Sequence, residues 1–148
     1  MIMSKKKYDQ DTGKELLHYL SGFVTPRRFE LFNTIAGNRT RYITLALENV
    51  YQSHNASAVL RTCDCFGIQD VHIIENSNPY EVNPDVALGA SQWLNLFRYN
   101  SGEESIVSCI SQLRKKGYRI VATTPNHQAI SLNDFDVTAG KLLNEKAW

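Results

Sequence analysis

The sequence predicts an α/β fold, in which a parallel sheet is flanked by helices and preceded by a small helical extension. Short apolar and β-branched runs alternate with segments of helical period along most of the chain. A glycine follows each of three helical segments, where a helix stop is expected. The 148 residues, 43% of them hydrophobic and 21% charged, suffice for one packed core. We therefore divide the chain into a basic helical extension over residues 1–41 and an α/β domain over residues 42–148.

Two helices are expected in the extension. The first covers Lys14–Leu20, which places three leucines on one side. The second begins after Thr25, a typical N-cap, with Pro26 at the first helical position, where its missing N–H is no loss. Apolar residues then recur at helical spacing until Gly37, which predicts the end of the helix.

The remainder predicts alternating strands and helices. The expected strands are Tyr42–Leu47, Val71–Ile74, Leu94–Tyr99 and Tyr118–Thr123. The expected helices are Asn55–Phe66, with Ala56, Val59, Cys63 and Phe66 facing inward, and Glu104–Lys116, with Ile106, Val107, Ile110 and Leu113 facing inward. Strands joined through helices make right-handed crossovers, so the sheet should be parallel.

Charge and composition limit the classes of function. The net charge is only +1, so bulk charge does not indicate a nucleic-acid binder. Basic residues nevertheless gather near the start of the chain, either as a solvated terminus or as an arm for RNA phosphates; as RNA contacts we select Lys5, Lys6, Lys7, Arg27, Arg28, Arg39 and Arg41. No apolar run approaches the ~20 residues of a membrane helix, and no secretory signal is evident, so we expect a cytoplasmic protein.

Neither metal binding nor nucleotide binding of the common kinds is indicated. The three cysteines lack the spacing of a zinc site and, as an odd number without a secretory signal, are expected to be reduced. The histidines are scattered along the chain. No glycine-rich phosphate loop is present, which disfavours a dinucleotide or triphosphate site.

The candidate site follows the first predicted strand, because open parallel sheets bind ligands at the carboxyl ends of their strands. The polar segment 48–55 ends at Asn55, which we expect to cap the next helix. On that helix Arg61 lies away from the predicted core face, together with Ser57 and Ala58. Spacing alone favours an ordinary ion pair between Arg61 and Asp64; the alternative is a guanidinium aimed at a phosphate.

Three segments resemble motifs of the SpoU, or TrmH-like, RNA ribose 2′-O-methyltransferases. The first runs from Glu48 to Gly67 and has an asparagine, Asn55, six residues before the pair Arg61-Thr62. Leu88–Trp93 resembles the family's Gly-Ala/Ser-x-x-Trp element, and Ile120–Thr123 resembles the strand that first meets the methyl donor. The matches occur in order over more than half of the chain.

This resemblance implies a SPOUT-type α/β-knot fold, S-adenosylmethionine as cofactor, a homodimer, and 2′-O-methylation of a ribose in tRNA or rRNA. It implies that Arg61 is the catalytic arginine, that Asn55 positions the site, and that Thr123 contacts the cofactor. The basic N-terminal segment would grip tRNA. We expect Trp93 to pack in the core, the more frequent fate of a tryptophan, rather than to stack on bases.

The resemblance weakens toward the C-terminus. Leu142–Glu145 is similar to the family's next element without its glycine, and the Ser-Leu-Asn segment of the knot is not found. We therefore expect an incomplete knot region and weak or no cofactor binding by these residues alone. A non-catalytic RNA-binding α/β module is the alternative function, and a generic nucleotide-binding or interaction domain is a third.

Overall fold

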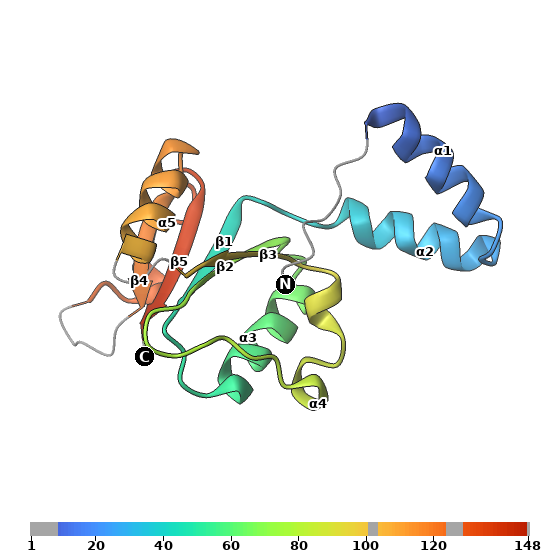
Figure 1. The fold of residues 1–148 in the computed structure, drawn as a ribbon. Helices are drawn as coiled ribbons and strands as arrows, with labels where there is room; N and C mark the ends of the chain where they lie inside the picture. The colour runs from blue at the N-terminus through green and yellow to red at the C-terminus, as the bar shows by residue number, and fades with distance from the viewer. Residues whose placement is uncertain (1–8, 101–103, 124–128, 148) are drawn as a thin grey trace. The chain divides into compact units, whose positions relative to one another are not determined.

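The computed structural model describes residues 9–100, 104–123 and 129–147. The chain forms two compact units, Met1–Asn38 and Arg39–Trp148. The first contains α1 (Gln10–Ser21) and α2 (Pro26–Gly37) (Figure 1). The second contains a five-stranded sheet with α3 (Ser53–Cys65), the short α4 (Pro84–Ala87) and α5 (Glu104–Lys115). No helix among the described residues has both the length and the apolar character needed to cross a membrane.

The helices of the first unit begin at side-chain caps. Asp9 accepts hydrogen bonds from the amides of Asp11 and Thr12, so α1 begins earlier than predicted. Thr25 caps α2 by accepting from the Arg28 amide at 3.3 Å, with Pro26 in the first position, which confirms the predicted start. Neither helix buries a residue, and the predicted apolar stripes are largely exposed.

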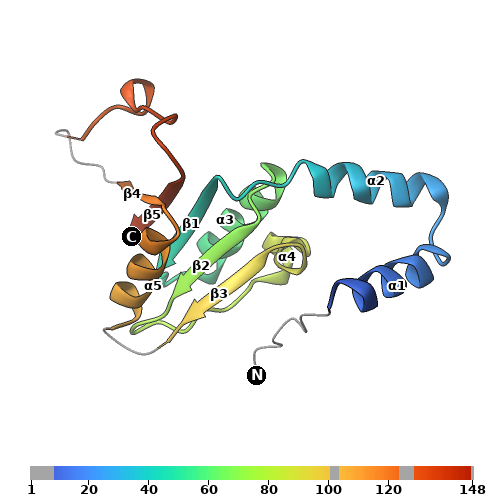
Figure 2. The same cartoon turned by 90° about the horizontal axis from the view of Figure 1, so that it is seen from above.

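All five strands of the second unit are parallel, in the order β3-β2-β1-β5-β4 (Figure 2). Their bounds are β1 Ile43–Glu48, β2 Asp70–Ile74, β3 Asn95–Tyr99, β4 Arg119–Thr123 and β5 Leu142–Ala147. The four predicted strands are confirmed to within one residue at each end. The predicted fold class, a parallel sheet flanked by helices, is also confirmed. β5, which the sequence did not reveal as a strand, lies between β1 and β4.

Each face of the sheet packs against a different helix. On one face Leu60 and Cys63 of α3 join Leu47, Val71 and Ile73 in a buried cluster. On the other face Cys109 and Leu113 of α5 pack with Ala46, Ile74 and Tyr118. The alternation of β2 between the two clusters is the period expected of a strand buried on both sides.

The predicted inward face of α3 is partly wrong. Ala56 and Cys63 are buried as expected, but Phe66 is 78% exposed and Ser57 is fully buried. Phe66 is the C-cap residue, so it has already left the helical path that the spacing assumed. The buried Ser57 hydroxyl accepts a hydrogen bond from the Asn83 amide at 2.8 Å. A polar side chain is tolerated in a core when it is hydrogen-bonded in this way.

The inward face of α5 needs one correction as well. Leu113 is buried and Ile106 packs against the core, as predicted, whereas Val107 is 64% exposed. The buried positions are Ser105, Cys109 and Leu113, spaced by four residues. The helix therefore presents a slightly rotated stripe to the sheet.

Candidate active site

The strands end together at one edge of the sheet, which we call the carboxyl edge. β1 ends at Glu48 and is followed by Asn49, which has a φ of 46°. The Asn49 side-chain oxygen accepts hydrogen bonds from the amides of Ser77 (3.0 Å) and Asn78 (2.9 Å) in the segment after β2. Asparagine adopts this left-handed conformation more readily than other residues. Asn49 thereby ties the ends of two neighbouring strands together.

The segment 75–83 is fixed at this edge by an arginine from β3. Arg98 donates to the Glu75 carboxylate through Nε at 3.0 Å and through Nη2, and its guanidinium lies 5.5 Å from the Tyr80 ring centroid. The Glu75 carboxylate also accepts from the Tyr80 amide at 2.7 Å. These hydrogen bonds, that of Arg98 first, lower the pKa of Glu75. Burial raises the pKa of Tyr80 to about 12, so its hydroxyl is protonated at neutral pH.

Asn55 lies in the first turn of α3, beside the carboxyl edge. The helix begins two residues earlier than predicted, with Gln52 as its N-cap, so the expectation that Asn55 caps the helix is wrong. Asn55 instead donates from its side chain to the Gln52 side-chain oxygen at 3.2 Å. Its amide group is half-buried and remains at the end of α3 that faces the carboxyl edge.

Arg61 lies six residues further along α3, about 9 Å along the helix axis. Its side chain is exposed. Asp64, the partner that spacing favoured, forms its ion pair with Arg39 instead. Arg61 has no ion pair with any residue that the structure describes. Its guanidinium is therefore available to a ligand.

Thr123 is the last residue of β4, and its side chain is exposed. It is in register with Lys146 of β5, and β5 in turn pairs with β1. Since neighbouring strands lie about 4.8 Å apart, the ends of β4 and β1 are separated by about 10 Å. The fold thus places Thr123 and Asn55 at the same edge.

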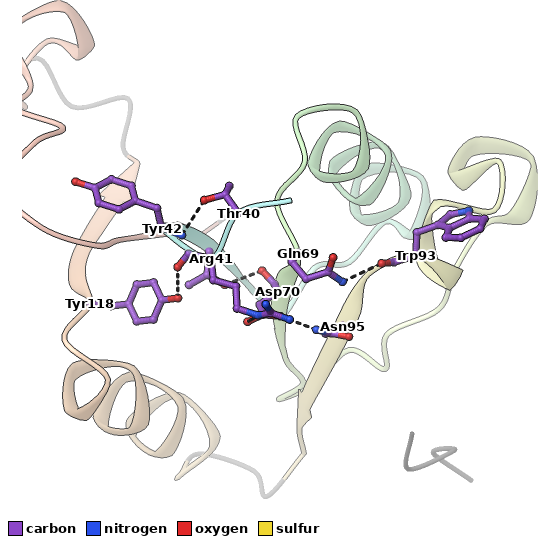
Figure 3. A network of polar contacts seen from close by, with 9 residues as sticks. Thr40, Arg41, Tyr42, Gln69, Asp70, Trp93, Asn95 and Tyr118 are labelled. Carbon is purple, nitrogen blue, oxygen red and sulfur yellow. Dashed lines mark hydrogen bonds and ion pairs between the residues drawn. The ribbon is translucent and has the colours of Figure 1, made fainter. Parts of the chain in front are cut away.

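The predicted RNA-contacting cations are dispersed. Arg27 and Arg28 are exposed in the first turns of α2 and line a hollow with Leu31 and Phe32. Arg39 and Arg41 lie where the chain enters β1, at the opposite edge from Asn55 and Thr123, and they pair with Asp64 and Asp70. Figure 3 shows Arg41 beside its partner Asp70. Lys5, Lys6 and Lys7 lie outside the described residues.

Metal ligands and thiols have no evident part in the site. No group of three potential ligands among histidine, cysteine, aspartate and glutamate occurs within the described residues. Cys63, Cys65 and Cys109 are thiols that form no disulfide, and burial raises the pKa of Cys63 to about 11. A buried thiol of this kind is unreactive at neutral pH.

Sequence reasoning missed Asn49, Glu75, Tyr80 and Arg98. The one available signal was position: Asn49 and Glu75 each follow a predicted strand directly, where site residues of parallel sheets are expected. Nothing in the sequence indicated that Arg98 on β3 would pair with Glu75, because the contact depends on the register of the sheet.

Comparison with protein families identifies one matching model, described as the SpoU rRNA Methylase family, over residues 42–146. Among curated proteins, a tRNA (guanosine(18)-2′-O)-methyltransferase of Borreliella burgdorferi is 41% identical over 129 residues, covering 87% of this chain and 57% of that protein. The enzyme of the same name from Escherichia coli K12 is 24% identical over 78% of this chain and 48% of its own length. The chain thus spans about half the length of the relatives it matches.

Solved structures show the same fold. A TrmH/SpoU tRNA-modifying enzyme from A. aeolicus superimposes with a TM-score of 0.70 at 19% identity, covering 82% of this chain and 60% of that one. A SpoU methyltransferase from Streptomyces viridochromogenes in complex with AdoMet gives a TM-score of 0.56 at 18% identity, over 72% of this chain and 43% of that one. At these identities the likeness establishes the architecture.

Proposed function

The chain belongs to the SpoU rRNA methylase family, and from that premise we propose that it carries the arginine-bearing part of an S-adenosylmethionine-dependent tRNA ribose 2′-O-methyltransferase. The observation that carries the proposal is the state of Arg61. It is exposed on the helix that follows β1, and Asp64 is engaged by Arg39. The B. burgdorferi relative, at 41% identity, favours tRNA over rRNA as the substrate.

Arg61 is the proposed catalytic residue. Its planar guanidinium binds a phosphate oxygen pair bidentately, which fixes the adjacent ribose. The 2′-oxygen gains negative character as its proton passes to a base, and a nearby guanidinium would stabilise that charge. A guanidinium has N–H donors and no acceptor atom, so we assign Arg61 to orientation and charge stabilisation rather than to proton removal.

Asn55 is the proposed positioning residue. It lies about one and a half turns before Arg61, closer to the end of α3 that faces the carboxyl edge. Its half-buried amide already bonds to Gln52, which restricts its rotation. The amide still offers its second N–H as a donor and its oxygen as an acceptor to a ribose or a phosphate. Holding the hydroxyl within about 3–3.5 Å of the reacting carbon is the largest contribution that such residues make.

The carboxyl edge fits one wall of a methyl-donor site. Thr123 exposes a hydroxyl there, beside the end of β5, and hydroxyl and backbone groups are suited to a ribose and an amino-acid moiety. S-adenosylmethionine supplies a sulfonium methyl group to the ribose oxygen when it is bound. We assign Thr123 to holding this cofactor. We also propose a cytoplasmic homodimer, in which α2 contributes Arg27 and Arg28 to tRNA binding.

Calorimetric titration of S-adenosylmethionine tests the cofactor assignment. Because the chain spans 57% of the B. burgdorferi relative, the titrated protein is this chain continued with the rest of that relative. We expect micromolar binding, weakened about tenfold by Thr123→Val, which removes one hydrogen bond. Thr62→Val, also at an exposed threonine, is the matched control and should bind as the parent does.

Two results would count against the proposal. Absence of binding by the continued chain would contradict the assignment of S-adenosylmethionine as the cofactor. Binding of tRNA by the 148-residue chain, together with no cofactor binding in either form, would favour a non-catalytic RNA-binding module.

A further inference from the structure

The segments that follow β1, β2 and β3 and the segments that precede the five strands carry opposite charge. Segments 48–55, 75–83 and 98–100 at the carboxyl edge contain three glutamates and one arginine, Arg98, which is paired with Glu75. Segments 39–42, 64–70, 93–95, 114–119 and 135–141 lie where the chain enters the strands. They contain seven lysines and arginines against three aspartates. We call this second surface the amino edge.

Contacts link the segments of the amino edge to one another, and Figure 3 shows those that join Thr40, Arg41, Gln69, Asp70, Trp93, Asn95 and Tyr118. Gln69 donates from its side chain to the Trp93 carbonyl at 2.9 Å, and its amide donates to the Thr40 carbonyl at 3.0 Å. The Tyr118 hydroxyl donates to the Arg41 carbonyl at 2.6 Å. The Tyr42 hydroxyl donates to a carbonyl of the last segment, that of Val137, at 2.8 Å. The surface is therefore preformed.

The carboxylates of the amino edge are already engaged. Asp64 pairs with Arg39 and Asp70 pairs with Arg41, while the Asp136 carboxylate accepts two hydrogen bonds from Thr138. The other five cations form no ion pair with a described residue: Arg114, Lys115, Lys116, Arg119 and Lys141. Helix α5 ends at Lys115, and its dipole favours cations in the last turn, where Arg114 and Lys115 lie. The dipole does not explain the presence of Arg119 or Lys141.

Aromatic rings are interleaved with these cations. Lys141 lies 5.6 Å from the Tyr118 ring centroid, and Arg119 lies 4.7 Å from that of Phe135. Trp93, predicted to be packed in the core, is instead 58% exposed, and Tyr42 is 41% exposed. Exposed rings among lysines and arginines are the arrangement with which proteins bind the backbone and bases of RNA.

We infer that the amino edge is a second RNA-binding surface, which contacts the sugar-phosphate backbone away from the methyl-transfer edge. This inference rests on the proposal that the substrate is RNA. Strands of five or six residues span about 17–20 Å, so one folded RNA can reach both edges. The acidic carboxyl edge would repel phosphates on its own, and the basic amino edge offsets that repulsion.

The test is fluorescence anisotropy of a labelled, unmodified tRNA transcript with the full 148-residue chain. Lys115→Gln/Lys141→Gln should raise the Kd about tenfold at low salt and reduce the slope of log affinity against log salt by about one to two. Val107→Glu/Ser111→Glu lowers the net charge equally on the exposed face of α5 and should change the Kd less than about twofold. Trp93→Ala should weaken binding without changing the salt slope.

Three outcomes would overturn the inference. The first is unchanged affinity and salt slope in the amino-edge variant, and the second is a loss of affinity in the α5 variant as large as that in the amino-edge variant. In both cases the proposed function would be untouched. The third is failure of the unaltered chain to bind the transcript, which would also contradict the proposal that the substrate is RNA. The cofactor titration would still test methyl-donor binding separately.

Discussion

Arg39, at the entry to β1, forms a part-buried ion pair with Asp64, near the end of α3. The side chains of Arg39 and Asp64 are 12% and 29% exposed. The pair fixes the last turn of α3 to the start of the sheet and withdraws Asp64 from Arg61, which lies three residues earlier. A structural ion pair thus leaves Arg61, the proposed catalytic arginine, unneutralised.

Asp64→Asn should destabilise the second unit. It leaves a largely buried guanidinium without its carboxylate, and an unsatisfied group of this kind costs about 2 kcal/mol. Urea unfolding followed by tryptophan fluorescence measures the loss. Asp11→Asn, which breaks the fully exposed pair with Lys14, is the control and should change stability little. Equal stability of the two variants would contradict the structural role of the Arg39 pair.

Ser57→Ala should also destabilise the fold, although it removes only one oxygen atom. The part-buried Asn83 amide would lose its acceptor, the hydroxyl of the fully buried Ser57, at a cost of about 1–2 kcal/mol. Thr62→Ala, at an exposed position on the same helix, should stay within about 0.5 kcal/mol. The urea midpoints of the two variants and the parent measure these changes in stability. A Ser57 variant as stable as the parent would show that the Asn83 amide finds another acceptor.

His72 should make stability depend on pH in mildly acidic solution. It is 2% exposed, and burial, assisted by Lys116, lowers its pKa to about 4. The unfolded chain, with an ordinary value near 6.5, binds the proton first, so stability is full above pH ~6.5 and falls as the pH drops toward 4. The loss is on the order of 3 kcal/mol.

Thermal or urea unfolding at several pH values measures this dependence. His72→Gln should flatten the profile in that window, whereas His54→Gln, at an exposed histidine, should retain it. A slope that survives the His72 substitution would assign the effect to another group.

Arg98→Lys should loosen the segment 75–83 although it keeps the charge. A lysine lacks the fork that grips the Glu75 carboxylate through two nitrogens. The Tyr80 amide, which donates to the same carboxylate, should exchange its hydrogen about tenfold faster. Arg41→Lys replaces the exposed arginine paired with Asp70 and is the control. Unchanged exchange at Tyr80 in the Arg98 variant would mean that the other contacts, those of Asn49 and Ser57, hold the segment.

The sequence predicted four strands accurately because each is a short run rich in apolar, β-branched or aromatic residues. β5 could not be found in this way. Leu142–Ala147 contains Asn144, Glu145 and Lys146 in succession, unlike the apolar runs of central parallel strands. Its place between β1 and β4 follows from the pairing of the whole sheet, which no local pattern reveals.

The candidate site was predictable only in part. The spacing from Asn55 to Arg61 and the resemblance identified these two residues and Thr123, whose roles remain proposals. The errors at Ser57 and Phe66 arose because a helical wheel does not register a buried hydrogen bond or the end of the helix. Asn49 and Arg98 act through contacts 28 and 23 residues distant in sequence, so their parts depend on the folded sheet.

The most direct measurement is the transfer of a labelled methyl group from S-adenosylmethionine to an unmodified tRNA transcript. The enzyme is this chain joined to the part of the B. burgdorferi relative that it does not cover, with and without Arg61→Ala. We predict 2′-O-methylation by the parent and a rate at least about a hundredfold lower for the variant, with the fold intact by circular dichroism. Equal rates for the two proteins would contradict the catalytic assignment of Arg61, and no transfer by a folded parent would contradict the proposed function.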